Sequence, residues 1–177
     1  APVEVVYGYL ADMEQHHPKF LPRAFSDFRV ESGGVGAGTV TTFTLTAGGR
    51  RRPYRMEVAE PVPGRVLTES DTRSSLVTTF TVEPVGRVGP MEPAGAGIGT
   101  AAGKDGADDA STAPAEGAGS CRVRIATRWE AAAGVGGFFE RLFAPATLRR
   151  LYDEELTLLD AYARRQAGAS AGGSGSP

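Results

Sequence analysis

The order of apolar and polar residues divides the chain into helical and strand-like parts. Ala1–Met13 begins with a proline suited to a first helical turn, and its apolar residues fall on one helical stripe. The stripe consists of Val5, Val6, Tyr9, Leu10 and Met13. This pattern predicts a short amphipathic helix, and Glu14–Pro22, with two prolines, predicts a second short helix or turn with Phe20 and Leu21 pointing inward.

From Phe25 to Trp129 the apolar period changes to two, which indicates half-buried antiparallel strands. Six strands are predicted: Phe25–Ser32, Thr39–Ala47, Pro53–Glu60, Val66–Asp71, Leu76–Glu83 and Arg122–Glu130. Short polar connections, including Gly48–Arg52, favour a meander. The inward residues are Phe43, Leu45, Tyr54, Met56, Val58, Phe80, Val82, Val123, Ile125, Thr127 and Trp129. The other face is rich in charge and predicts a wet side of the sheet.

The strongest helical signal lies in Gly136–Arg165. Its apolar stripe contains Leu148, Leu151, Tyr152, Leu158, Leu159 and Tyr162. Pro145 interrupts this pattern, so we expect a separate turn around Phe138–Phe143 before the long helix. Strands followed by one long helix indicate an α+β fold.

Two segments have little apolar material for a core. Gly86–Gly119 is rich in glycine and alanine and has no aromatic residue, which predicts a disordered insertion. A mobile lid over a ligand site is the alternative. Residues 167–177 predict a flexible tail. Residues 1–85 and 120–166 are therefore expected to form one domain.

Composition excludes several classes of protein. The 177 residues carry a net charge of −2, so nucleic acid is not an expected partner. We find no apolar run long enough for a membrane span and no signal-peptide pattern, and we expect a soluble cytoplasmic protein. The single cysteine, Cys121, is expected to be a small structural residue. The glycine run Gly33–Gly38 precedes a strand, not a helix, which argues against a nucleotide site.

Catalytic candidates are few. Glu155 lies at the centre of the apolar helical stripe, so its carboxyl group must be paired with another group, face a water-filled cavity or have a raised pKa. Strand alternation places Glu69 on the inner face with Leu67, unless the strand end twists toward solvent. His17 is a possible general base, although a surface or capping role is the simpler interpretation. The only two histidines, His16 and His17, are adjacent, so we expect no metal site, and no cofactor motif is present.

The order of these elements resembles the START-like or SRPBCC superfamily, particularly its polyketide cyclase/dehydrase and lipid-transport branch. The resemblance rests on APVEVVYGYLADMEQHHPKFLP, GAGTVTTFTL, VAEPVPGRVLTES, LVTTFTVEPVG and LRRLYDEELTLLDAYARR. It implies a helix-grip fold, a curved antiparallel sheet around the C-terminal helix, with a cavity for apolar molecules. Two departures are the long insertion and the absence of the family's first strand, which would precede Ala1. We therefore expect six strands here.

Three functions follow from this resemblance. The first is a binding or carrier protein for a lipid-like or polyketide-like apolar small molecule. The second is a polyketide aromatase, cyclase or dehydrase using Glu155, Glu69, a tyrosine or His17 for proton transfer. The third is a co-chaperone or partner-binding module that uses the arginine-rich hairpin at Arg50, Arg51 and Arg52 and an open sheet edge. The predicted ligand-binding residues are Phe43, Tyr54, Met56, Glu69, Phe80, Trp129, Leu148, Tyr152, Glu155 and Leu159.

Overall fold

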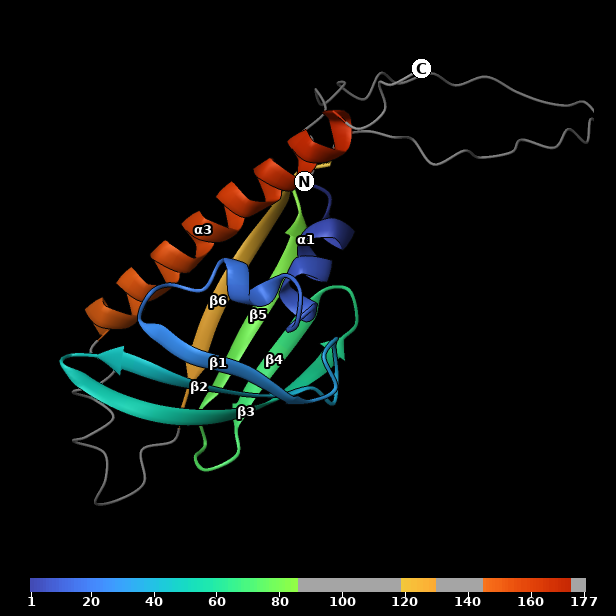
Figure 1. The fold of residues 1–177 in the computed structure, drawn as a ribbon. Coiled ribbons are helices and arrows are strands. Elements are labelled where there is room, and N and C mark those ends of the chain that lie inside the picture. The colour runs from blue at the N-terminus through green and yellow to red at the C-terminus, as the bar shows by residue number, and fades with distance from the viewer. Residues whose placement is uncertain (86–118, 130–144, 173–177) are drawn as a thin grey trace, which may run out of the picture.

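The computed structural model describes residues 1–85, 119–129 and 145–172. In chain order its elements are α1 (Val3–Ala11), the 3-10 helix η1 (His17–Lys19), β1 (Phe25–Ser32), β2 (Val40–Ala47), β3 (Arg50–Val62), β4 (Val66–Asp71), β5 (Val77–Pro84), β6 (Cys121–Arg128) and α3 (Pro145–Gly172). The strands form a curved sheet, and α3 runs obliquely across its open side (Figure 1).

The described strands form one antiparallel sheet in the order β1-β2-β3-β4-β5-β6. Every neighbour in the sheet is also a neighbour in sequence, as expected for the short connections between β1 and β5; β6 pairs with β5 although the long insertion separates them in sequence. This arrangement confirms the predicted α+β fold of a six-stranded curved sheet with a C-terminal helix. Within the described residues, β1 and β6 form the two edges.

The hairpin between β2 and β3 is tighter than predicted. Gly48 and Gly49 alone make the turn, with φ angles of 55° and 74°, and Ala47 already pairs with Arg50. Such positive φ angles favour glycine. The predicted loop Gly48–Arg52 was therefore wrong in its second half, because its arginines belong to β3.

Strand β1 contains an irregularity that the alternation did not predict. The register against β2 shifts between Ser26 and Arg29, and Asp27 between them has a φ of 57°. Aspartate tolerates this left-handed conformation better than most residues. The extra residue brings Phe25 and Phe28, three positions apart, against the same core cluster.

The helices also differ from the prediction in detail. Helix α1 buries Val3, Val6, Tyr7 and Leu10, whereas Val5, assigned to the buried stripe, is exposed. Helix α3 continues to Gly172, beyond the predicted end at Arg165 and into the predicted tail 167–177, through a segment that includes the strong helix former alanine. The predicted turn at 138–143 and the insertion up to residue 118 lie outside the described residues.

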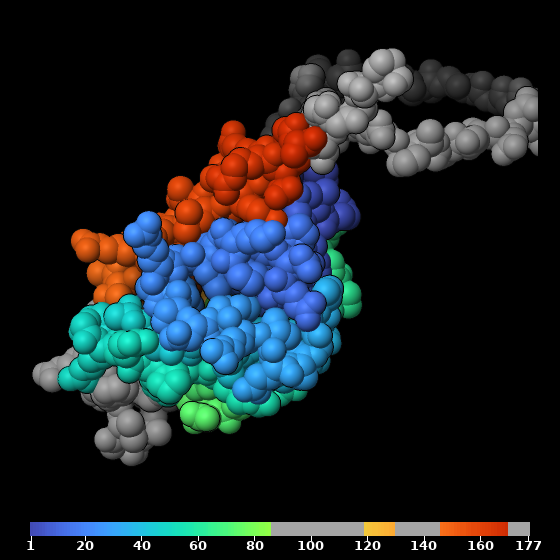
Figure 2. All heavy atoms as spheres, viewed as in Figure 1, coloured from blue at the N-terminus to red at the C-terminus, as the bar shows by residue number. Residues whose placement is uncertain are grey.

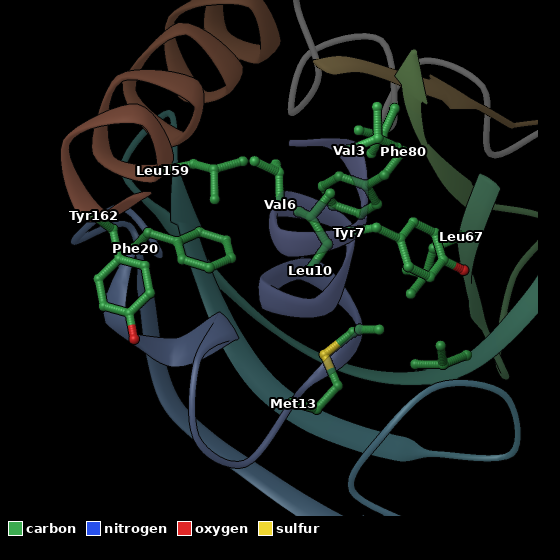
Figure 3. Packing of buried hydrophobic residues seen from close by; sticks show 13 residues of the cluster. Val3, Val6, Tyr7, Leu10, Met13, Phe20, Leu67, Phe80, Leu159 and Tyr162 are labelled. Carbon is green, nitrogen blue, oxygen red and sulfur yellow. The ribbon is translucent and has the colours of Figure 1, made fainter. Parts of the chain in front are cut away.

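Apolar side chains between the sheet and the helices form two clusters. The first joins α1 and Phe20, which directly follows η1, to the sheet and the C-terminal half of α3, and it includes Leu10, Phe80, Leu159 and Tyr162 (Figure 3). The second lies under the N-terminal half of α3 and contains Phe43, Leu45, Tyr54, Met56, Leu76 and Leu151. Residues of the N-terminal segment and of α3 lie against one another in the space-filling view (Figure 2).

The length of α1 explains why the two ends differ. At 1.5 Å per residue, α1 is about 14 Å long and α3 about 42 Å. The short helix therefore fills one end of the curved sheet, and among the described residues no helix other than α3 packs against the second cluster. This end is where a cavity remains.

Candidate functional site

The cavity lies between the second cluster and the inner face of α3. Its walls consist of Leu21, Phe25, Phe28, Phe43, Leu45, Tyr54, Met56, Glu69, Leu76, Thr78, Phe80, Thr127, Leu148, Leu151, Tyr152 and Glu155. The free volume of the cavity, measured for the centre of a water-sized sphere, is about 50 Å³. This volume is enough for a few water molecules. A large ligand would therefore have to displace part of the wall.

Eight of the ten predicted ligand-binding residues lie on this wall. They are Phe43, Tyr54, Met56, Glu69, Phe80, Leu148, Tyr152 and Glu155. Leu159 does not, because it packs in the first cluster with the residues of α1. Trp129, just beyond the end of β6, packs against the second cluster without lining the cavity.

Several wall residues were absent from the predicted set. Phe25 and Phe28 were missed because the irregularity at Asp27 breaks the alternation of β1. Thr78 was missed although it shares an inner face with Phe80, two positions along β5. A search for polar residues in phase with the apolar inner positions would have found it.

Glu69 and Glu155 are the two acidic groups among the described residues of the wall. They come from β4 and α3, and their residues are 9% and 3% exposed, which confirms that both point inward. Burial raises the pKa of Glu69 to about 7. Burial and, to a smaller extent, the neighbouring charge of Glu69 raise the pKa of Glu155 to about 8. The pair therefore holds at least one proton near neutral pH.

His17 lies behind Glu69, so the expected surface or capping role was wrong. Its ring is buried, and its Nδ1 is 2.8 Å from the carbonyl oxygen of Leu10. A carbonyl only accepts, so Nδ1 carries a hydrogen, and in the neutral ring Nε2 presents its lone pair. Nε2 is 3.9 Å from Glu69 Oε1. Burial lowers the pKa of His17 to about 4, so the ring is neutral at pH 7.

Hydroxyl groups line the wall between sheet and helix. The Tyr152 hydroxyl is hydrogen-bonded to Thr127 Oγ1, which is also 2.9 Å from Thr78 Oγ1. Burial is the main cause of the raised pKa of Tyr152, and the charges of Glu155 and Glu69 add to it. This hydroxyl chain therefore lies beside the two carboxyl groups.

The Tyr54 hydroxyl differs from the others because it is buried and its hydrogen has no acceptor among the described residues. The guanidinium of Arg52 lies near it but can only donate, so it does not accept this hydrogen. Burial raises the pKa of Tyr54 to about 12, so the group keeps its proton throughout the neutral range. An unpartnered buried hydroxyl costs free energy. It also leaves one donor free at the cavity wall.

Replacing Tyr54 with phenylalanine should stabilise the ligand-free protein. Removal of an unpartnered buried hydroxyl should raise the free energy of unfolding by about 1 kcal/mol, measured by urea denaturation. Tyr7→Phe is the matched control, since the Tyr7 hydroxyl donates to Glu60 Oε1 at 2.7 Å and its loss should destabilise. Equal losses of stability in both variants would contradict the assignment of Tyr54.

The described residues contain neither a metal-binding cluster nor a membrane-spanning helix. In the described ranges, no three histidine, cysteine, aspartate or glutamate side chains gather in a way that suits a metal ion. No described helix combines the length and hydropathy needed to cross a membrane.

Comparison with known proteins assigns the family. A family model described as polyketide cyclase/dehydrase and lipid transport matches residues 1–164. The chain belongs to this family. The cyclase/dehydrase and lipid-transport chain is also similar to the KanY protein (ms6282), whose solution structure was determined by NMR. The identity is 32%, over 93% of this chain and 90% of that chain, with a TM-score of 0.66. Curated proteins give no match.

Membership in the polyketide cyclase/dehydrase and lipid-transport family agrees with the resemblance seen in the sequence. The family's description covers both carriers and enzymes, and it favours an apolar small molecule as the ligand.

Proposed function

We propose that this protein binds an apolar small molecule of lipid or polyketide character in the cavity between the sheet and α3. The observation that carries this proposal is the composition of the wall, where aliphatic and aromatic side chains surround a few convergent polar groups. Walls of this kind are typical of small-molecule sites. The family assignment supports the same ligand class.

The shape of the cavity limits what enters without rearrangement. The free space suits one small ring or a short chain, since only about 50 Å³ is open to the centre of a water-sized sphere. Leu148 and Leu151 of α3 face Phe43 and Met56 of the sheet across this space. A longer ligand requires α3 to move away from the sheet, and its affinity is reduced by the cost of that movement.

Filling the cavity with a larger side chain should weaken ligand binding strongly. Thr78 and Thr79 are adjacent on β5, and only Thr78 lines the cavity. Thr78→Phe should weaken binding of 4-propylphenol by about 100-fold, because the new ring takes the ligand's place. Isothermal titration calorimetry measures the effect. Thr78→Val, which has the size of threonine without its hydroxyl, separates filling from the loss of a hydrogen bond.

Thr79→Phe, on the outer face of the same strand, is the matched control and should bind as the wild type does. Equal binding by the Thr78→Phe and wild-type proteins would place the ligand elsewhere and contradict the proposal. A folded Thr78→Phe variant, verified by its circular dichroism spectrum, is required for the comparison.

A second function is favoured by the two buried carboxyl groups. Glu69 and Glu155 share one cavity and hold protons to about pH 7 and about pH 8. Between these values one carboxyl group is ionised and the other is protonated, which is the arrangement of a general base beside a general acid. This favours proton transfer at a bound ketone, the type of step that a cyclase or dehydrase requires.

A further inference from the structure

We propose that the cavity selects uncharged, oxygen-bearing apolar molecules, with a hydroxyl or carbonyl group at the polar wall, and excludes carboxylates and phosphates. This inference rests on the proposed function, because it specifies the chemical class of the ligand of the same cavity. It separates ketones, phenols and alcohols from fatty acids and phospholipid headgroups.

The first observation is the charge of the wall. Among its described residues the only ionisable acids or bases apart from two tyrosines are Glu69 and Glu155, and none is a lysine, arginine or histidine. A bound carboxylate would lose its hydration without gaining a cation. It would also face two carboxyl groups, of which either, once ionised, repels it.

Arg52 and His17 are cationic or titratable groups beside wall residues, but neither lines the cavity. Arg52 lies 4.9 Å from the centre of the Tyr54 ring, and its Nη2 is 3.9 Å from Asp71 Oδ2. Neither Arg52 nor Asp71 lines the cavity. His17 is behind Glu69, and its buried ring is neutral at pH 7. No counter-ion for an anionic ligand is therefore provided by the described wall.

The second observation is the unpartnered hydroxyl of Tyr54. This group lies on a residue that is 3% exposed and lines the cavity. It has a hydrogen to donate, and a ligand carbonyl or hydroxyl oxygen would accept it. On α3, protonated Glu155 provides a second donor, and an ionised Glu69 would accept from a ligand hydroxyl. The wall can thus form a hydrogen bond with a neutral oxygen group of the ligand whether that group accepts or donates.

Three probes with one ring and one side chain test the selection at pH 7: 4-propylphenol, 4-propylbenzoate and 4-propylbenzylamine. We expect the phenol to bind about 100-fold more tightly than the benzoate, since an unpaired buried charge is costly. We expect the cationic amine to bind no more tightly than the phenol, because its ammonium group loses hydration and a buried carboxyl group must first release a proton to solvent before it can serve as the counter-ion. Calorimetric titration of the wild-type protein gives all three affinities.

Variants locate the cause of the selection. Tyr54→Phe should weaken the binding of 4-propylphenol about tenfold through loss of one hydrogen bond. Glu69→Gln should narrow the phenol-to-benzoate affinity ratio about tenfold by removing the carboxyl group that ionises first, and Glu155→Gln should narrow this ratio less, because the Glu155 carboxyl group is protonated at pH 7. Thr79→Phe, outside the cavity, should change none of these affinities.

The outcomes distinguish this inference from the proposed function. A benzoate that binds as tightly as the phenol, or an amine that binds more tightly, overturns the inference and leaves the cavity as an apolar binding site. If none of the three probes binds, both fail. A preference for the phenol that Tyr54→Phe, Glu69→Gln and Glu155→Gln all leave unchanged also overturns it, because the selection then arises elsewhere.

Discussion

Replacing Glu155 with glutamine should remove a large part of the protein's loss of stability at alkaline pH. In the folded protein Glu155 keeps its proton to about pH 8, whereas its ordinary value is 4.5. The native state therefore binds more protons than the unfolded chain between these values, and rising pH favours unfolding. The shift corresponds to a loss of stability on the order of 5 kcal/mol for this single group.

The comparison of wild type and Glu155→Gln isolates this group. Glutamine has nearly the shape of protonated glutamate, so the two free energies of unfolding should be similar at pH 4.5 and diverge toward pH 8.5. Buried His17 has the opposite effect, because stability falls as pH drops from 6.5 toward about 4, but it acts equally in both proteins. Urea denaturation across this pH range measures the difference.

Glu57→Gln is the control, since Glu57 lies exposed on the outer face of β3. Its stability curve should follow that of the wild type. If the Glu155→Gln curve also runs parallel to the wild type from pH 4.5 to 8.5, Glu155 is not a buried group with a raised pKa, and the description of the polar wall fails.

The second large effect concerns proton transfer at a bound ketone. With 4-phenylbutan-2-one in D₂O, an ionised carboxylate of the pair would take an α-proton, breaking the C–H bond. The electron pair moves to the carbonyl oxygen, to which the protonated carboxyl group donates its proton. The product is an enol, and reversal with exchanged carboxyl groups places deuterium on carbon. The wild-type protein should accelerate this exchange, followed by proton NMR.

Acid and base must be present together, so the exchange rate should be greatest between about pH 7 and about pH 8. Glu155→Gln should reduce it by roughly 10²- to 10⁴-fold, the usual contribution of a general acid or base, while Glu57→Gln leaves it unchanged. A carrier would bind the ketone without accelerating the exchange. If the wild-type and Glu155→Gln proteins exchange equally slowly but both bind the ketone, the enzymatic alternative is contradicted.

Much of the inner face followed from periodicity alone. The alternation of β3 and β5 places Tyr54, Met56 and Phe80 on one surface because successive side chains in a strand point to opposite sides. The helical stripe of α3 placed Glu155 among Leu151, Tyr152 and Leu159 by the same kind of argument. The inward direction of both cavity acids was therefore predictable from the amino-acid sequence.

Other parts depended on contacts that a one-dimensional pattern does not contain. His17 belongs to a three-residue helix, which is too short to show a period, so its burial was not foreseen. Leu159 shares its stripe with Leu151, yet α1 covers only the end of the sheet beneath Leu159. Leu159 therefore packs in the first cluster, and Leu151 lines the cavity. The unpartnered hydroxyl of Tyr54 likewise depends on its neighbours in space.

The most direct test of the binding site is the location of a bound probe. Intermolecular nuclear Overhauser effects between 4-propylphenol and the isotope-labelled protein should connect the ligand to Leu45, Met56 and Leu151, from β2, β3 and α3. Contacts confined to the separate hollow lined by Cys121, Val123 and Leu159, with none to these three residues, would contradict binding between the sheet and the N-terminal half of α3.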